Sequence, residues 1–367
     1  MIAGGGTTGH VSPGLAVADV LRSRGAEVLF VGTARGPESR IVPQAGFAFT
    51  EVDVIGRDRG TLTVRNARAV AKLLRATMRC LGIVSQFRPT VILGTGGYVS
   101  LPAAFAARLS AVPLVLHEQN SIPGLANRVA KRFAVAVGVS FPGSETFFGE
   151  SAVVVGNPVR AEIAGLDRSA LRDQATHFFE LGPDEPTLLV FGGSQGAQSI
   201  NEAVIEAASE LRASGMQVLH LCGTEKLEAT TAAVGKLKLE LGSDFTYRVV
   251  GYTDRMDLAY SCADLALCRA GASTIAELAA VGLPALLVPL PFSLDNDQRH
   301  NAEAVVAAGG GRMILNADLT PARVASEVKE LLFDRLELEA MGKAIGSMAR
   351  LDAADRLADL VMGAASP

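Results

Sequence analysis

The segment GGGTTGHVSPG spans residues 4–14 and follows the short apolar run Met1-Ile2-Ala3. Ser12 suits a helix N-cap and Pro13 suits the first helical position, which predicts a strand, a glycine turn and then a helix. Glycine permits positive φ and close backbone approach, and a helix N-terminus presents N–H groups and a positive dipole. The segment is therefore a candidate phosphate cradle with His10 at its rim, or else a tight turn before a helix.

Two nucleotide motifs are disfavoured here. The spacing Gly4-x-Gly6-x-x-Gly9 matches the dinucleotide fingerprint, which also needs an acidic residue about 20 positions on to hold a ribose. The next apolar run, residues 28–31, leads instead into Gly32-Thr33-Ala34-Arg35. NAD is disfavoured for that reason, and a P-loop is disfavoured because no lysine follows the glycines.

Charge is divided unevenly along the 367 residues, a length sufficient for two domains. Residues 1–160 hold 17 Lys and Arg against 9 Asp and Glu, whereas residues 161–367 hold 17 against 29. A basic half predicts contact with membrane lipid, nucleic acid or a phosphorylated substrate. The absence of Trp and the 5% aromatic content argue against a base-stacking nucleic-acid surface.

The cysteines and histidines carry no metal signature. The four cysteines are scattered, and the five histidines form no evident cluster, so no metal and no cofactor are expected. Without a signal peptide or an apolar run near the ~20 residues of a spanning helix, we expect a cytoplasmic protein with free thiols. Only three residues precede the glycines, short for a central strand of ~5 residues, which indicates a natural start upstream of Met1.

Short Val-, Leu- and Ile-rich runs alternate with helical stretches along the whole chain, the pattern of βαβ units and parallel sheets. The series restarts after Gly156-Asn157-Pro158-Val159-Arg160. This predicts an α/β protein with two doubly wound, Rossmann-like domains facing a cleft, residues 1–158 and residues 159 onward, with the glycine turns lining that cleft. The predicted strands are 27–31, 47–52, 90–93, 113–117, 134–137 and 152–155, then 187–191, 217–221, 246–250, 265–268, 285–288 and 312–314.

Residues 62–81 predict a basic amphipathic helix. Its five basic residues recur at spacings of 3, 4, 3 and 4 and form one stripe. They are Arg65, Arg68, Lys72, Arg75 and Arg79, beside the apolar residues Val64, Ala67, Val70, Ala71, Leu74, Met78 and Leu81. Such a helix lies on anionic membrane surfaces. The alternative is an ordinary packed helix with a solvated basic face.

Three further strings suggest chemistry. Gly192-Gly193-Ser194-Gln195-Gly196 matches either a hydrolase nucleophile elbow, with only His220 and His300 downstream as possible bases, or a second phosphate cradle. The string 295–297, Asp-Asn-Asp, could bind a metal ion, but it more simply opens a helix. In residues 272–278, Glu277 falls about one turn into a predicted helix, where its carboxylate could reach a ribose whose phosphates lie on the helix N-terminus.

A family resemblance connects these strings. In order from residue 3 to about residue 310 they read GGGTTGHVSPGLAVA, GTGGYVSLP, HEQNSIPGLAN, GNPVR, FGGSQGAQSIN and CRAGASTIAELAAVGLPALLVPLP. Together they resemble the N-acetylglucosaminyltransferases of bacterial cell-wall synthesis. The resemblance implies the GT-B architecture and inverting transfer of GlcNAc from UDP-GlcNAc to the 4-hydroxyl of MurNAc-pentapeptide on undecaprenyl diphosphate.

By the same resemblance, the enzyme is peripheral at the cytoplasmic face of the cell membrane, and a helix at about 348–367 packs back on the first domain. The second domain, which binds UDP-GlcNAc by this resemblance, is therefore expected to end near residue 347. The lipid-linked acceptor favours contact between the basic stripe and an anionic membrane surface. A UDP-sugar epimerase of the same architecture and a serine hydrolase built on Ser194 are the alternatives.

The resemblance also assigns site residues. His10 matches the proposed base, Ser194 the donor diphosphate, Glu277 the ribose, Thr253 the uracil and Gln298 the sugar. The substrate-binding residues implied are Thr7, Thr8, Gly9, Asn120, Arg160, Ser194, Thr253, Ala272, Ser273, Thr274, Ile275, Ala276, Glu277 and Gln298. The family usually has glycine where this chain has Thr8, which places a Cβ where the backbone is expected to approach the ligand.

Overall fold

The computed structural model describes residues 1–54, 64–193, 195–241, 245–292 and 296–365, without the side chains of 64–70, 238, 240 and 241. It forms two compact units. Unit 1 comprises Met1–Arg160 and Arg350–Pro367, and unit 2 comprises Ala161–Ala349.

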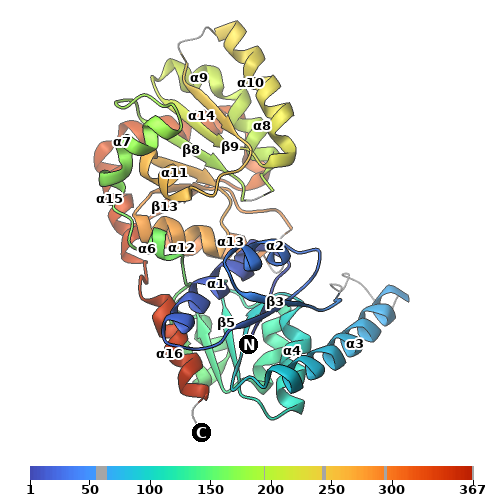
Figure 1. Ribbon diagram of the computed structural model, residues 1–367. Coiled ribbons are helices and arrows are strands. Elements are labelled where there is room, and N and C mark those ends of the chain that lie inside the picture. The colour runs from blue at the N-terminus through green and yellow to red at the C-terminus, as the bar shows by residue number, and fades with distance from the viewer. Residues whose placement is uncertain (55–63, 194, 242–244, 293–295, 366–367) are drawn as a thin grey trace. The chain divides into compact units, whose positions relative to one another are not determined.

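Unit 1, where Figure 1 labels β3 and β5, is built on a seven-stranded parallel sheet in the order β3-β2-β1-β4-β5-β6-β7. Its strands are β1 (Ile2–Gly4), β2 (Leu29–Gly32), β3 (Ala48–Glu51), β4 (Ile92–Gly96), β5 (Leu114–Glu118), β6 (Ala136–Val139) and β7 (Ala152–Val154). Each overlaps a strand predicted from the sequence, and the parallel pairing confirms the predicted fold class. In this doubly wound order the direction of winding changes between β1 and β4, where ligands bind outside the carboxyl ends of the strands.

Helices cover both faces of this sheet, which explains why its central strands are apolar on both sides. They are α1 (Thr8–Ser23), α2 (Glu38–Gln44), α3 (Val64–Phe87), α4 (Ser100–Leu109), α5 (Leu125–Ala130) and α16 (Ala353–Ala365). Helices α1 and α16 pack together, burying Leu15 and Leu357 in one core with Leu93 of β4. Helices α3 and α4 pack together on a second core, which holds Ile83 and the neighbouring strand residue Ile92.

The first helix begins earlier than the sequence predicts. Helix α1 starts at Thr8, with Thr7 as an extended N-cap, so the predicted start at Ser12 and Pro13 is wrong. The amide groups of His10 and Val11 already donate to the Thr7 carbonyl, at 3.2 and 3.3 Å. Pro13 is therefore inside the helix, where it removes one backbone donor. Thr8, Gly9 and His10 consequently form the first turn of the helix.

Unit 2 repeats the architecture with a six-stranded parallel sheet in the order β10-β9-β8-β11-β12-β13. Its strands are β8 (Thr187–Phe191), β9 (Gln217–Leu221), β10 (Tyr247–Val250), β11 (Leu265–Cys268), β12 (Ala285–Leu287) and β13 (Gly311–Met313). Its helices are α6 (Ala161–Ala164), α7 (Arg168–Phe178), α8 (Gln198–Glu206), α9 (Ala208–Ala213), α10 (Leu227–Leu241), α11 (Met256–Cys262), α12 (Ala272–Val281), α13 (Asp297–Ala307), α14 (Pro321–Phe333) and α15 (Arg335–Ser347). The winding changes between β8 and β11, which are direct neighbours.

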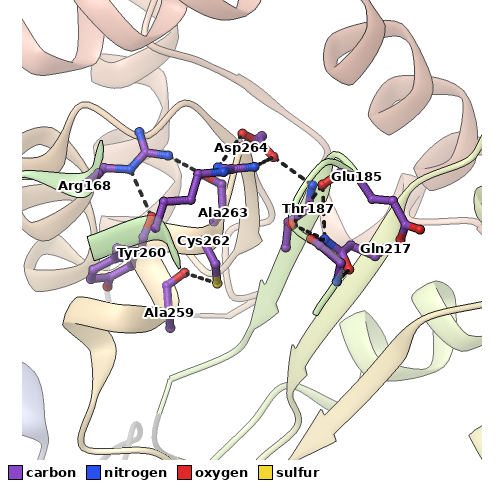
Figure 2. A network of polar contacts seen from close by, with 11 residues as sticks. Arg168, Glu185, Thr187, Gln217, Ala259, Tyr260, Cys262, Ala263 and Asp264 are labelled. Carbon is purple, nitrogen blue, oxygen red and sulfur yellow. Dashed lines mark hydrogen bonds and ion pairs between the residues drawn. The ribbon is translucent and has the colours of Figure 1, made fainter. Parts of the chain in front are cut away.

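A polar network ties α7 to α11 and to the start of the sheet in unit 2 (Figure 2). Arg168 donates from Nε to the Tyr260 carbonyl at 3.0 Å. The Arg172 guanidinium donates to both carboxylate oxygens of Asp264, at 3.0 and 3.1 Å. The Thr187 amide donates to the same carboxylate at 2.8 Å. The network fixes α11, the helix that carries Tyr260.

Candidate functional site

In unit 1 the residues predicted to bind or react lie at the carboxyl ends of β1 and β4. Gly6, at φ +86°, turns the chain from β1 into α1, whose first turn carries His10. The Thr95 hydroxyl at the end of β4 donates to the His10 carbonyl at 2.8 Å. A Cβ on Gly96 would lie 2.9 Å from His10 Nδ1, so this loop packs directly against the imidazole ring.

The His10 side chain is half-buried. Among the described contacts of its ring, the hydrogen bond to a protein side chain is made at Nδ1, to a side-chain amide. Its Nδ1 lies 3.0 Å from Oε1 of Gln119, which follows β5. Gln119 Nε2 donates to the Thr95 carbonyl at 2.8 Å and lies 2.9 Å from His117 Nδ1. Burial lowers the pKa of His117 to about 4. Sequence reasoning noticed the HEQN string but missed Gln119, because its partner His10 is 109 positions away.

A buried carboxylate occupies the glycine turn. Glu38 is 1% exposed, and its Oε2 accepts the Gly6 amide at 3.0 Å. Its Oε1 accepts the amide and the hydroxyl of Thr33, at 2.9 and 2.8 Å. The phosphate cradle predicted around Gly6 is therefore wrong at that residue, because its N–H group already faces a carboxylate. Thr8 is the first residue of the helix and its φ is not positive, so its Cβ is accommodated.

A second buried carboxylate organises the loop after β5. Glu118 accepts the amides of Asn120 and Gly124, at 3.0 and 3.1 Å, and the Asn127 side chain at 2.9 Å. Burial raises the pKa of Glu118. Asn120 is thereby held half-buried at the end of β5, while Arg160, also half-buried, follows β7 at the end of the first part of unit 1.

In unit 2 the glycine turn after β8 is tightly packed. Gly193 and Gly196 have φ values of +86° and +67°, and a Cβ on Gly196 would overlap the Cys222 carbonyl. Lys226 Nζ donates to the Gln195 carbonyl at 2.6 Å and holds the turn from outside. Ser194 itself lies outside the described residues.

The segment 272–277 forms the first part of α12, directly after β11 and beside that turn. Gly271 is the N-cap and no side chain caps the helix. Glu277 Oε2 accepts the Tyr260 hydroxyl at 2.7 Å, and Tyr260 is fully buried. Ala272 and Ile275 are buried, whereas Ser273, Thr274, Ala276 and Glu277 are partly exposed. The sequence contained no local signal for Tyr260, which belongs to α11.

The buried residue Arg269 lies between the N-termini of helices α8 and α12. Arg269 donates to the carbonyls of Val288 and Pro289 at 3.1 Å, to Asn316 Oδ1 at 2.9 Å and to the Ser199 hydroxyl at 2.9 Å. Burial lowers the pKa of its guanidinium. None of these described partners is a carboxylate, so its positive charge adds to the positive ends of α8 and α12 and favours an anion nearby.

Two more predicted residues lie at the same edge of the unit 2 sheet. Thr253 follows β10, and its hydroxyl accepts the Arg255 amide at 3.0 Å. Gln298 is the second residue of α13, and its Oε1 accepts the Leu290 amide at 2.9 Å. Asp297 accepts the Gln298 amide at 2.8 Å, as expected of a helix-opening acid. In the described ranges no group of three or more His, Cys, Asp or Glu side chains is placed to hold a metal ion.

The histidines do not support a serine hydrolase. His220 is fully buried, with Nδ1 2.9 Å from the Tyr247 hydroxyl and Nε2 3.0 Å from Asn201 Oδ1. Both ring nitrogens are thus committed within the core. His300 lies on the exposed side of α13 and pairs with Glu303 at 3.1 Å. His220 is therefore not available as the base of a nucleophile at the β8 turn.

The comparisons with known proteins agree with this geometry. Residues 1–139 match the glycosyltransferase family 28 N-terminal domain, and residues 187–357 match the glycosyltransferase family 28 C-terminal domain. The UDP-N-acetylglucosamine--N-acetylmuramyl-(pentapeptide) pyrophosphoryl-undecaprenol N-acetylglucosamine transferase of Nocardioides sp. is 46% identical, over 99% of this chain and 97% of its own. The crystal structure of Acinetobacter baumannii MurG matches with a TM-score of 0.76 and 30% identity, over 99% of this chain and 98% of that one. The chain belongs to the MurG family.

MurG-family membership also confirms the GT-B architecture expected from the resemblance. A putative UDP-N-acetylglucosamine 2-epimerase from Listeria monocytogenes has a TM-score of 0.67 but only 13% identity, over 97% of this chain and 93% of its own, and so shares the fold alone. Within the described residues no helix combines the length and apolar character needed to cross a bilayer.

Helix α3 of this MurG-family chain has an unusual surface. Ala76, Cys80 and Ile83 face the core, whereas Leu74 and Met78 of the predicted apolar stripe are 64% and 68% exposed. The exposed pair is interleaved with the exposed residues Arg75 and Arg79. Lys72 is paired with Asp53 at 2.9 Å, and the side chains of Arg65 and Arg68 lie outside the described part.

Proposed function

We propose that this chain transfers GlcNAc from UDP-GlcNAc to the 4-hydroxyl of undecaprenyl-diphosphate-linked MurNAc-pentapeptide, with inversion at the anomeric carbon. The observation that carries the proposal is the 46% identity, over nearly the whole of both chains, to a transferase whose name states this donor and acceptor. The product is the disaccharide-linked lipid precursor of peptidoglycan. No metal ion or cofactor is required in this scheme.

The donor is assigned to unit 2. Ser194 and the N-terminus of α12, residues 272–276, receive the diphosphate and nucleotide, and Glu277 receives the ribose hydroxyls. Thr253 contacts the uracil and Gln298 the sugar, with its carboxamide Nε2 as the donor since Oε1 accepts from Leu290. UDP leaves as an anion, and the helix dipoles together with Arg269 stabilise that charge.

The acceptor and the base are assigned to unit 1. A sugar hydroxyl is a weak nucleophile near neutral pH and needs a base within hydrogen-bond reach, a role that neutral histidine can fill. His10 is half-buried in the first turn of α1, with Thr7, Thr8 and Gly9 beside it. We assign these residues, with Asn120 and Arg160, to the substrates.

The His10→Ala variant tests the base. We expect kcat to fall by ~10²-fold or more, because general-base catalysis contributes about that much, with little change in UDP affinity. His177→Ala, an exposed histidine on α7, is the matched control and is expected to keep wild-type turnover. Turnover of His10→Ala within a few-fold of wild type would remove the assignment.

One assay separates the transferase from its rivals. UDP release from UDP-GlcNAc is measured with and without lipid-linked MurNAc-pentapeptide. A transferase releases UDP only with the acceptor, whereas an epimerase acts on the donor alone. Labelling by a fluorophosphonate probe would indicate the Ser194 hydrolase instead.

We also propose that α3 contacts an anionic membrane surface at the cytoplasmic face of the membrane. A purely structural helix would bury its apolar residues, but Leu74 and Met78 are exposed beside Arg75 and Arg79. Apolar side chains flanked by arginines suit the boundary between acyl chains and anionic headgroups.

Vesicle binding tests this contact. Each basic residue near an anionic surface contributes about 1 kcal/mol, so Arg75→Glu/Arg79→Glu should weaken binding to phosphatidylserine-containing vesicles at low salt by roughly 30-fold or more. The control Arg40→Glu/Arg335→Glu changes the net charge equally but uses exposed residues outside α3. Equal loss in both variants would indicate a general charge effect and would contradict the assignment to α3.

A further inference from the structure

We propose that Gln119 and His117 form a positioning relay that holds neutral His10 in the Nδ1–H tautomer, so that Nε2 is the atom that takes the proton from the acceptor hydroxyl. The inference rests on the proposed role of His10 as base. It concerns two residues that touch no substrate in the proposed scheme and act only through His10. Three hydrogen-bonded contacts within unit 1 make up the relay.

The relay starts at the buried end. His117 Nε2 lies 3.0 Å from the Gly156 carbonyl and 3.4 Å from the Ser140 hydroxyl, which itself donates to the Glu118 carbonyl at 2.9 Å. Both neighbours of Nε2 are therefore acceptors, which requires a proton on Nε2. Because burial disfavours the charged ring, His117 is neutral and its Nδ1 carries a lone pair.

That lone pair helps to orient the Gln119 amide. Its two nearest polar neighbours on one side are the Thr95 carbonyl, at 2.8 Å, and His117 Nδ1, at 2.9 Å. Both accept hydrogen bonds, so the NH₂ end must face them and donates both of its hydrogens. A flipped amide would place its oxygen against the Thr95 carbonyl and the imidazole lone pair. The Oε1 end consequently faces His10.

The tautomer of His10 follows from this orientation. An amide oxygen only accepts, and it lies 3.0 Å from His10 Nδ1, so Nδ1 must carry the proton. In the neutral ring the lone pair is then on Nε2. The Gly96-Gly97 loop packs closely against this ring, because a Cβ added to Gly96 or Gly97 would lie only 2.9 or 3.2 Å from Nδ1 or Cδ2.

The relay serves the proposed transfer step. As the acceptor oxygen bonds to the anomeric carbon, its O–H bond breaks and the proton moves to His10 Nε2. The bond from the anomeric carbon to the UDP oxygen breaks, and its electron pair leaves with UDP. If Nε2 carried the proton instead, the ring could not accept another proton there. In serine proteases, loss of the residue that sets the histidine tautomer costs up to ~10⁴ in kcat, which shows how much such an orienting residue can matter.

Nitrogen NMR tests the relay without an activity measurement. The protein is labelled with ring-¹⁵N histidine, and among the five histidines the His10 signals are identified by their loss in His10→Asn. At a pH where the ring is neutral, we expect a protonated Nδ1 and an unprotonated Nε2 in the wild type. Gln119→Met, which removes the acceptor facing Nδ1, should lose this pattern. A wild-type ring protonated at Nε2 would overturn the relay.

Kinetics give the second readout. For Gln119→Met we expect kcat to fall at least 10-fold while KM for UDP-GlcNAc stays within about twofold, since the donor belongs to unit 2. The matched control is Gln217→Met, a buried glutamine of unit 2 that bonds to Gly182 and Thr187 (Figure 2). It should lose comparable thermal stability but keep kcat. Equal kcat losses in both variants would reduce Gln119 to a structural role and overturn the relay.

The two proposals fail separately. If His10→Ala keeps its turnover while the wild-type spectrum shows Nδ1–H, the base assignment is wrong and the positioning contact stands. If His10→Ala loses turnover while the spectrum shows Nε2–H, the base stands and the relay is wrong.

Discussion

The Glu38 carboxylate offers a quantitative test of how the first glycine turn is held. In Glu38→Gln the amide oxygen can replace Oε1 and keep both bonds to Thr33, but the NH₂ group then faces the Gly6 amide. One charge-assisted hydrogen bond, worth about 1.5–3 kcal/mol, is exchanged for a contact between two donors. Because Gly6 is exposed and its amide can turn to water, we take about 2 kcal/mol as the loss in the unfolding free energy of unit 1.

Calorimetry and kinetics together measure this loss. For a unit of this size, about 2 kcal/mol corresponds to a fall in Tm of roughly 4–8 °C, and UDP addition, which should stabilise unit 2, distinguishes the two transitions. The turn sets the position of His10, so kcat should also fall by roughly 10-fold. Glu150→Gln, an exposed glutamate of unit 1, is the control and should stay within about 0.5 kcal/mol. Wild-type stability and kcat in Glu38→Gln would refute the reasoning.

Two further predictions concern Tyr260 and the buried histidines. Tyr260→Phe removes the 2.7 Å hydrogen bond to Glu277 at nearly constant side-chain volume. We expect KM for UDP-GlcNAc to rise roughly 10-fold, as for the loss of a hydrogen bond to a charged group, and kcat to stay within about threefold of wild type. An unchanged KM would contradict the proposal that Tyr260 positions Glu277. Burial lowers the pKa of His117 and His220 from 6.5 to about 4, so below pH 6.5 the unfolded chain binds more protons and stability falls as the pH falls. Each unit holds one of these histidines, so its unfolding free energy, measured by urea unfolding, should fall by about 2 kcal/mol between pH 7.5 and pH 5. His220→Leu should make the stability of unit 2 less sensitive to pH. An unaltered pH dependence in this variant would contradict the role of His220.

Local pattern was sufficient for the strands. The bounds of β8, β9 and β11 coincide with the predicted runs 187–191, 217–221 and 265–268. Parallel strands buried on both faces are built mostly from apolar residues, and glycine or proline ends them, so the information lies within a few neighbouring residues. The start of α1 was missed for the converse reason: Ser12 and Pro13 form a good local cap signal, but the backbone is already helical from Thr8.

The sequence by itself determined the two parallel sheets, the glycine turns after β1 and β8, the position of Glu277 near the start of α12, and the family. Only the tertiary structure decided which groups hold those turns and orient their side chains. Glu38 reaches Gly6 across 32 positions, Gln119 reaches His10 across 109 and Tyr260 reaches Glu277 across 17. Hydrogen bonds of this kind leave no periodicity in the chain, because the two partners meet only after the strands between them have aligned side by side in the sheet.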